Sequence, residues 1–386
     1  MLPRGDRAMF LAAPITALLM ALTLGGDTVA EELQAGPRWT SAQLLQLRQL
    51  IDRAPEDGLP RPDSRDFEAA LSAGQGGRIN PLATGLALRL ARMHLSGAAA
   101  QEERIEWFIA DSDAARLLEP ELAAALADDR LDSFFTGLRP QSPGYAALRT
   151  ALAAESDAAR RTMLARNMER WRWLPQSLGN DFVFANAAGF EVALWRQGRE
   201  VKTWPAISGK TETPTPAISS IITAVNFNPW WEVPASISSV SPMSARRGFV
   251  LYKGRYRQRP GPGNSLGQMK LVMYNPHNIY LHDTPSRSLF GARERAFSHG
   301  CIRVSDALGF AQTLLGTAKS KEEIDKIIED KDSVLVHLPR ELPVYVAYFT
   351  ADTGPHGQVR FHRDIYGRDA GIVSVDGSRA ARVALR

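Results

Sequence analysis

One short stretch of this sequence gathers residue types that can attack a carbonyl group. Residues 298–304 read Ser-His-Gly-Cys-Ile-Arg-Val, and Cys301 is the only cysteine of the chain. A second histidine, His282, stands a short distance upstream. A single thiol near histidine bases is typical of nucleophilic catalysis, in which an imidazole takes the proton of the thiol. The stretch therefore predicts acyl-transfer chemistry at Cys301.

Such chemistry also needs donors for an oxyanion and an anchor for the substrate, and both have candidates. Gly300 lets a substrate approach the backbone, so the N–H groups of Gly300 and Cys301 are candidate oxyanion donors. A helix expected to begin near Ser305 would favour a thiolate if its N-terminal end points at the thiol. Arg303 has a forked guanidinium that suits a substrate carboxylate, with an ordinary salt bridge as the alternative.

Two histidines compete for the role of general base. A side chain next to the nucleophile on a tight turn often points away from it, whereas a strand end can bring a distant imidazole within reach. We therefore predict that His282 is the base and that His299 is structural or orients the substrate. Asp283 is a weak third member, because neighbours on a strand face opposite sides, and a backbone carbonyl could orient His282 instead.

The same residues do not have the pattern of a metal site. His282, His299 and Cys301 lack the tight ligand spacing of a zinc site, and a fourth protein ligand is missing from the set. We therefore expect neither a metal nor another cofactor, and the chemistry would depend on side chains and backbone groups alone.

The first part of the chain, residues 31–174, is predicted to be a helical scaffold domain. Thr40 and Ser41 can cap a first helix, and later segments have apolar residues at helical spacing or are rich in alanine. Segments rich in Pro, Gly and Asp separate them. Helices are expected over residues 41–50, 82–93, 114–126 and 146–164.

The pattern changes at Pro175, which ends the last of these helices. Alternating segments follow, and Gln197-Gly198-Arg199 predicts a hairpin turn between two of them. Strands are expected at residues 182–184, 190–195, 201–204, 218–227, 269–274, 279–282, 334–337 and 344–349, and helices at 305–315 and 321–329. The predicted fold class is α+β, with a mostly β, sandwich-like catalytic domain over residues 175–369.

Two segments are harder to assign. Residues 234–268 are rich in Pro, Gly, Ser and Arg, and a long irregular segment inside a domain is usually functional or disordered. Because this segment lies just upstream of His282, we interpret it as a candidate lid over the substrate. Residues 370–386 are expected to be a loose tail.

Charge and the N-terminus bear on the class of partner and the compartment. The net charge is +4, from 46 basic and 42 acidic residues, without a basic run interleaved with aromatics, so we expect no nucleic-acid partner. Arg4 and Arg7 precede an apolar run and a small-residue site at Ala30, the pattern of an export signal over residues 1–30. An uncleaved membrane anchor is the alternative. Either way, the body of the protein is expected outside the cytoplasm, in the periplasm.

Several motifs in this order resemble the L,D-transpeptidases, the family with a YkuD-type catalytic domain. The core of the resemblance is Ser298-His299-Gly300-Cys301 preceded by His282. The other motifs resemble the large periplasmic branch with an N-terminal scaffold domain, and they are residues 170–175 (Arg-Trp-Arg-Trp-Leu-Pro), 227–231, 261–267, 280–287 and 364–369. The resemblance covers roughly residues 130–370 well and the earlier helices loosely.

The resemblance implies a reaction on peptidoglycan. The cysteine of such enzymes attacks the carbonyl of a diaminopimelate residue in a tetrapeptide stem, D-alanine leaves, and an amine of a neighbouring stem takes the acyl group to form a 3→3 cross-link. For this chain it implies His282 as the base and acylation of Cys301 by carbapenems. The residues that it implies for substrate binding are Arg303, His299, Ser298, Tyr280 and Trp231.

The chain departs from this family pattern in one clear respect. Relatives often carry a small peptidoglycan-binding domain before the Arg-Trp motif, whereas residues 148–170 read as one continuous helix. The segment 234–268 is also shorter than the expected lid. Two alternatives stay open: the same acyl-enzyme used for hydrolysis, D-amino-acid exchange or attachment of an envelope protein, and a non-catalytic wall-binding scaffold. The intact set of His282, Gly300, Cys301 and Arg303 argues against the scaffold.

Overall fold

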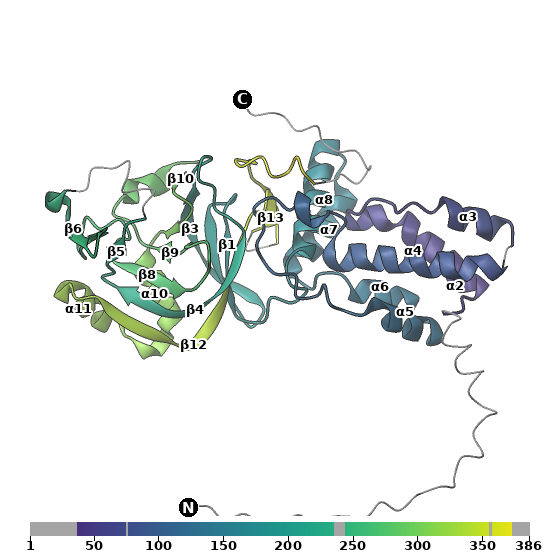
Figure 1. Ribbon diagram of the computed structural model, residues 1–386, viewed down its shortest axis with the longest axis horizontal. Coiled ribbons are helices and arrows are strands. Elements are labelled where there is room, and N and C mark those ends of the chain that lie inside the picture. Colours follow the sequence, from purple (N-terminus) through teal and green to yellow (C-terminus); the bar gives the residue numbers. More distant parts are fainter. Residues whose placement is uncertain (1–36, 75, 235–243, 355–356, 373–386) are drawn as a thin grey trace, which may run out of the picture.

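The computed structural model describes residues 37–74, 76–234, 244–354 and 357–372. The molecule is elongated, with helices at one end and a strand-rich part at the other (Figure 1). The predicted α+β class is confirmed, since a helical region precedes a mostly β region with a few helices. The expected export signal over residues 1–30 lies outside the described residues.

The helical region begins with a well-defined cap. Thr40 and Gln43 form a capping box that starts α2, as the sequence predicted. The helices are α2 (Ser41–Asp52), α3 (Arg65–Ser72), α4 (Gly76–Ser96), α5 (Leu118–Ala127), α6 (Leu131–Gly137), α7 (Pro143–Ala154) and α8 (Ala158–Arg172). The apolar faces of α2 to α6 share one core, which includes Leu47, Leu90, Leu122 and Phe135. Those of α7 and α8 belong to a separate core.

One expected helix is interrupted. The sequence predicted a continuous helix through residues 148–170, but α7 ends at Ala154 and α8 begins at Ala158. The carboxylate of Asp157 accepts a hydrogen bond from the Arg160 N–H at 2.8 Å and so caps α8. The prediction was wrong because the alanine-rich flanks hide this capping signal. The short connection still leaves no room for an inserted domain.

The strand-rich part is built on one sheet that closes on itself. In the described part of the chain its order is β10-β3-β11-β9-β8-β4-β12-β1-β2, and the long strand β3 pairs with both β11 and β2. The strands are β1 (Phe182–Asn186), β2 (Glu191–Arg196), β3 (Arg199–Gly209), β4 (Ile218–Phe227), β8 (Met269–Met273), β9 (Leu281–His282), β10 (Ala296–Ser298), β11 (Ile302–Val304) and β12 (Val334–Ala347).

Two features of this sheet bear on the sequence reading. Gln197 and Gly198 have φ of 51° and 71° and form the expected tight turn between β2 and β3. The strands expected at 334–337 and 344–349 are one strand, β12, whose pairing with β4 shifts register between His337 and Leu342. A bulge of this kind interrupts the alternation of apolar and polar residues, so the sequence predicted two strands where there is one.

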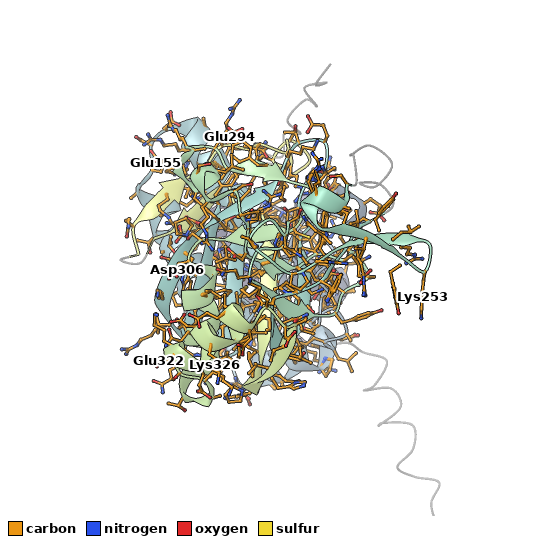
Figure 2. All side chains as sticks on the ribbon, turned by 90° about the vertical axis from the view of Figure 1, so that its left-hand side faces the viewer. Glu155, Lys253, Glu294, Asp306, Glu322 and Lys326 are labelled. Carbon is orange, nitrogen blue, oxygen red and sulfur yellow. The ribbon has the colours of Figure 1, made fainter. Side chains whose placement is uncertain are left out.

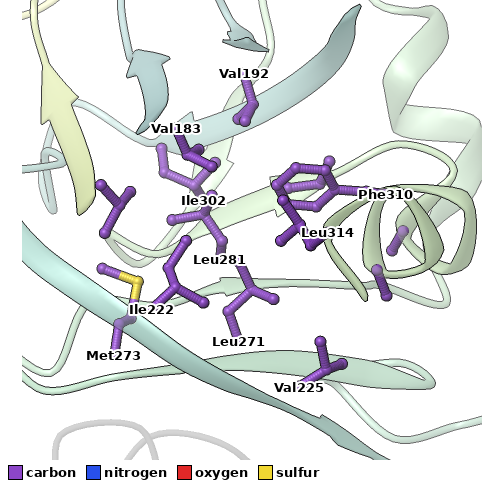
Figure 3. Close-up of a cluster of buried hydrophobic side chains, with 14 of the residues drawn as sticks. Val183, Val192, Ile222, Val225, Leu271, Met273, Leu281, Ile302, Phe310 and Leu314 are labelled. Carbon is purple, nitrogen blue, oxygen red and sulfur yellow. The ribbon is translucent and has the colours of Figure 1, made fainter. Parts of the chain in front are cut away.

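The main apolar core lies inside the closed sheet. Strand side chains such as Ile222, Leu271, Leu281 and Ile302 meet there, each no more than 1% exposed (Figure 3). Helix α10 (Ala307–Leu315) directs Phe310 and Leu314 against them, and α11 (Lys321–Asp330) follows on the outside. This core fixes which face of β9 and β11 points inward, and therefore which side chains face the site.

The candidate lid segment is more regular than the sequence suggested. It contains β6 (Phe249–Tyr252) and β7 (Arg255–Gln258), which form a hairpin that pairs with β5 (Trp231–Glu232). The turn residues Lys253 and Gly254 both have positive φ, as a two-residue hairpin turn requires, and Lys253 projects at the tip (Figure 2). Residues 235–243 lie outside the described residues, and the lid function stays a prediction.

The helical and strand-rich parts share a second core at their junction. Trp107, Trp171 and Trp173 of the first part pack with Phe182 and Phe349 of the second. The hairpin of β13 (Ala351–Thr353) and β14 (Val359–Phe361) lies against α7 and α8. The domain boundary at residue 174 stays a prediction, and packing is continuous across it.

The first residues of the expected loose tail, residues 370–386, lie against the core. Ile372 is only 1% exposed and belongs to the core at the junction, so residues 370–372 are packed. Residues 373–386 lie outside the described residues. Within the described ranges, no helix combines the length and apolar character needed to cross a bilayer.

Candidate active site

Three neighbouring strands place basic side chains in a row. On β8 and β9, Lys270 is the partner of His282, and on β9 and β11, His282 is the partner of Arg303. Side chains at paired positions lie on the same face of a sheet. The strand register therefore brings Lys270, His282 and Arg303 side by side, although they are distant in the sequence.

The thiol lies on the same face as this row. Leu281 and Ile302 are paired and point into the core, so the residues on either side of each point to the opposite face. These are Tyr280 and His282 on one strand, and Cys301 and Arg303 on the other. The predicted nucleophile and base are thus diagonal neighbours, with Cα atoms about 8 Å apart by strand geometry, a spacing that the two side chains can bridge.

The turn that carries the thiol is held from within. We call residues 298–301 the thiol turn. The Ser298 hydroxyl donates to the Cys301 carbonyl at 2.5 Å and accepts from the Gly300 N–H at 3.1 Å. Gly300 has a φ of 109°, a conformation that other residues rarely adopt, so glycine is required there.

These bonds correct two predictions. The Gly300 N–H is already bound, so of the two predicted oxyanion donors the Cys301 N–H is the one that remains a candidate. The Ser298 side chain is 1% exposed and satisfied within the turn, so it positions the turn and does not reach a substrate. Adjacent residues on a tight turn bond to one another, which the sequence alone did not reveal.

The helix dipole does not act on the thiol as predicted. Strand β11 separates Cys301 from α10, which begins only at Ala307. The Asp306 carboxylate caps that helix by accepting from the Gly309 N–H at 3.3 Å. Dipole effects fade within one turn of a helix end. Stabilisation of a thiolate must therefore come from other groups.

A backbone carbonyl orients His282, as the sequence predicted. The His282 Nδ1 lies 2.5 Å from the carbonyl oxygen of Asp283, which can only accept, so Nδ1 carries a proton in this contact. The ring has a second backbone hydrogen bond, with Leu266. Burial lowers the pKa of His282 to about 3, with a further lowering by Arg303. The imidazole is therefore neutral at physiological pH and can take a proton.

Asp283 faces away from this chemistry. Its carboxylate accepts from the Gln268 N–H at 2.8 Å and pairs with Arg287 at 3.1 Å. A Cβ on Gly267 would lie 2.3 Å from that carboxylate, so Gly267 is the residue that lets the loop close over it. Asp283 thus fixes the loop before β8 and is not a third member of the site.

The thiol is protonated in the resting protein. Burial raises the pKa of Cys301, and three groups act against this: the Tyr280 backbone N–H first, then the charges of Arg303 and Lys270. The thiol donates to the carbonyl of Asn278, with 3.6 Å between Sγ and the oxygen. With both groups neutral, the imidazole takes the thiol proton only when the sulfur attacks a substrate.

Arg303 is a half-buried cation that forms no salt bridge with a carboxylate in the described part of the chain. Its Nε is buried and has no hydrogen-bond partner in the part of the chain that the structure describes. Burial lowers the pKa of Arg303, and the group that raises it is Cys301. A half-buried guanidinium whose buried Nε has no partner is costly unless a ligand supplies the missing contact and charge. This favours the predicted carboxylate anchor over an ordinary salt bridge.

The remaining predicted residues surround the thiol at different distances. Tyr280 lies beside Cys301 by strand pairing, and the Lys270 ammonium is 4.4 Å from the centre of its ring. Burial lowers the pKa of His299, and Lys210 and Arg303 lower it further, so His299 is near these cations and neutral. Trp231 packs against Phe249 on the hairpin, with 6.2 Å between the ring centres.

Lys270 is the functional candidate that sequence reasoning missed. Burial lowers its pKa, and Cys301 is the first of the groups that raise it, so the ammonium and the thiol interact. Lys270 stood inside an expected strand, but only the register of β8 against β9 places it beside His282. Elsewhere in the described ranges, no cluster of His, Cys, Asp and Glu could hold a metal ion.

Comparison with known proteins agrees with this geometry. Residues 180–346 match the YkuD family, described as the L,D-transpeptidase catalytic domain, and residues 32–152 match the Scaffold domain. A Haemophilus influenzae protein named "Putative L,D-transpeptidase" is 28% identical over 239 residues, which is 54% of this chain and 48% of that protein. The chain thus spans about half the length of this curated relative.

Solved structures of similar proteins are more distant. An L,D-transpeptidase from Mycobacterium smegmatis is 18% identical over 43% of this chain and 58% of its own, with a TM-score of 0.25. L,D-transpeptidase 3 from Mycobacterium tuberculosis, in complex with a faropenem-derived adduct, is 18% identical over 44% and 60%, also with a TM-score of 0.25. With TM-scores this low, the two structures add no argument about this site.

The pKa shifts predict how Cys301 reacts with iodoacetamide. The alkylation rate should rise with pH beyond 9, the ordinary thiol value, because burial raises the pKa of Cys301. Lys270→Met removes a charge that lowers this pKa, so it should shift the curve to higher pH, and Arg303→Met should shift it further. Lys253→Met, at the exposed hairpin tip, is the control. A plateau below pH 7 would instead indicate a preformed thiolate–imidazolium pair.

Proposed function

This chain carries an L,D-transpeptidase catalytic domain behind a Scaffold domain, and from that premise we propose that it cross-links peptidoglycan through a thioester on Cys301. The observation that carries the proposal is that β9 and β11 present three reactive groups on one face of the sheet. That face holds a thiol, a neutral imidazole and, within the described residues, a guanidinium that forms no salt bridge with a carboxylate. These are a nucleophile, a base and an anchor for a carboxylate.

The first half-reaction forms the acyl-enzyme. His282 takes the thiol proton while the sulfur of Cys301 attacks the carbonyl carbon of the diaminopimelate residue in a tetrapeptide stem. The C–N bond to D-alanine then breaks, its nitrogen takes the proton from His282, and D-alanine leaves. The Cys301 N–H is the proposed donor to the oxyanion of the intermediate.

The second half-reaction transfers the acyl group. An amine of a neighbouring stem attacks the thioester carbon and gives a proton to His282. The C–S bond breaks, and the thiolate recovers the proton from His282. The product is a 3→3 amide between two diaminopimelate residues, and the energy of the original amide bond is retained, so no ATP is consumed.

Electrostatics supports a substrate that carries carboxylates. Lys270 and Arg303 flank the thiol, and positive charge in a partly buried site attracts an anionic substrate and stabilises an oxyanion. Stem peptides carry free carboxylates, which fit Arg303 in particular. The export pattern over residues 1–30 fits a place of action in the periplasm, where peptidoglycan is found.

A product assay tests the proposed reaction. Wild-type protein incubated with purified disaccharide-tetrapeptide should release D-alanine and form a 3→3 dimer, read by mass spectrometry. Cys301→Ala should lower the dimer yield by about 10³-fold or more, because the nucleophile is lost. Undiminished dimer from this variant would refute the mechanism. Free tripeptide or exchanged stems without dimer would favour hydrolysis or exchange.

A second test addresses the carboxylate anchor. Arg303→Met should lower kcat/KM for the tetrapeptide donor by about 100-fold, because a desolvated charge loses its partner. Arg303→Lys should recover only part of the loss, since an ammonium cannot bind a carboxylate in the same forked geometry. Arg340→Met, an exposed arginine on β12, is the matched control. Equal kcat/KM in Arg303→Met and wild type would exclude the anchor role.

A further inference from the structure

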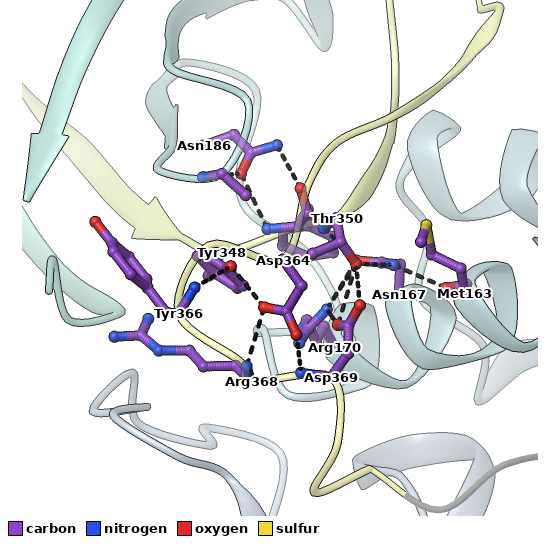
Figure 4. Close-up of polar contacts among 12 residues, drawn as sticks. Met163, Asn167, Arg170, Asn186, Tyr348, Thr350, Asp364, Tyr366, Arg368 and Asp369 are labelled. Atoms are coloured by element: carbon purple, nitrogen blue, oxygen red, sulfur yellow. Dashed lines mark hydrogen bonds and ion pairs between the residues drawn. The ribbon is translucent and has the colours of Figure 1, made fainter. Parts of the chain in front are cut away.

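Two sequence motifs that the reaction does not use meet at the junction of the helical and strand-rich parts. Arg170, in the Arg-Trp motif on α8, forms a buried ion pair with Asp369 at 2.7 Å. The Thr350 hydroxyl donates a hydrogen bond to the same carboxylate at 2.9 Å and accepts one from the Asn167 side-chain amide at 2.8 Å (Figure 4). A scaffold helix and the segment 364–369 are thus tied together by groups that water does not reach.

Asp364 extends this network toward the sheet. One carboxylate oxygen accepts from the Tyr348 hydroxyl at 2.7 Å and from the Arg368 N–H at 3.0 Å, and the other accepts from the Asp369 N–H at 2.9 Å (Figure 4). The Tyr348 hydroxyl in turn accepts from the Tyr366 N–H at 3.0 Å. The rings of the two tyrosines stack at 5.0 Å. The position of Tyr366 is therefore fixed on several sides.

Tyr366 and Arg368 hold the loop between β3 and β4. The Tyr366 hydroxyl donates to the Gly209 carbonyl at 2.5 Å and accepts from the Thr215 N–H at 3.3 Å. The Arg368 guanidinium donates to the Thr215 carbonyl at 3.0 Å. Thr215 is completely buried, and both ends of its backbone are bound to the segment 364–369.

The Thr215 side chain reaches the thiol turn. Its hydroxyl accepts from the Gly209 N–H at 2.8 Å and donates to the Gly300 carbonyl at 2.8 Å. That carbonyl belongs to the same peptide unit as the Cys301 N–H. A trans peptide is planar, with C=O and N–H pointing in opposite directions. Fixing the Gly300 carbonyl therefore fixes the direction of the Cys301 N–H.

We propose that Thr215 is a positioning residue that aims the Cys301 N–H at the oxyanion, and that the segment 364–369 links this alignment to docking of α8. The inference rests on the proposed function, because an oxyanion forms only if Cys301 is acylated. It gives a role to both unexplained motifs, as the two ends of one hydrogen-bonded path from the scaffold helix to the thiol turn.

Two reactions of the same thiol separate alignment from reactivity. In acylation by a carbapenem, the S–C bond forms, the β-lactam C–N bond opens, the ring nitrogen gains the thiol proton, and an oxyanion develops on the way. Alkylation by iodoacetamide displaces iodide and needs no oxyanion donor. A residue that only aims the N–H should affect the first rate and spare the second.

The test compares Thr215→Val with Thr215→Ser. Valine keeps the shape but removes the hydroxyl, so acylation by imipenem should slow by about 100-fold, the effect of losing one oxyanion donor. Alkylation by iodoacetamide should keep the wild-type rate, and serine should preserve most of the acylation rate. Thr223→Val, on β4 and away from the thiol turn, is the matched control and should change neither rate.

The outcomes are distinguishable. Equal acylation of Thr215→Val and wild type would overturn the inference and leave the proposed function intact, as would an equal loss of both rates. A wild-type protein that imipenem does not acylate would overturn the proposed function and the inference with it. If Thr215→Val does not fold, Tyr366→Phe, which removes the hydroxyl that holds Thr215, is judged by the same two rates and should slow acylation alone.

Discussion

The site depends on one electrostatic constraint: the charges of Lys270 and Arg303 are half-buried beside a thiol, and within the described residues Arg303 forms no salt bridge with a carboxylate. The register of β8, β9 and β11 imposes this arrangement by aligning Lys270, His282 and Arg303 on one face. The opposite face must hold Leu281 and Ile302 in the core. A shift of one residue would turn the charged side chains into the apolar core and the apolar side chains onto the site, so the core itself maintains the charged row.

Beside these cations, the thiol of Cys301 and the imidazole of His282 are both uncharged in the resting protein. Burial keeps the thiol of Cys301 protonated and the imidazole of His282 unprotonated. In the proposed reaction, Arg303 binds the carboxylate of a substrate, and the positive charge beside the thiol stabilises the oxyanion of an intermediate. The second requirement is that the Cys301 N–H points at the oxyanion. The hydrogen-bonded path from Arg170 through Tyr366 to Thr215 holds the peptide unit of that N–H from outside the sheet.

The sequence predicted a nucleophile and a base, but not the residues around them. Cys301 and His282 could be found from residue type and motif, and the carbonyl partner of His282 from strand alternation. Lys270 and Thr215 could not, because cross-strand register and loop contacts are not encoded in local spacing. The predictions that a helix dipole acts on the thiol and that the Gly300 N–H is an oxyanion donor were wrong for a related reason. Strand β11 has only three residues, and the Ser298 side chain bonds within its own turn, so neither leaves a periodic pattern in the sequence.

The most direct test of the account is the intact mass of the protein during turnover. Wild-type protein mixed with disaccharide-tetrapeptide and quenched by acid should carry one disaccharide-tripeptide acyl group. Peptide mapping should place that group on Cys301 as a thioester that hydroxylamine removes. Dimer formation without such an adduct, or an adduct on another residue, would contradict the central claim that this thiol carries the acyl group.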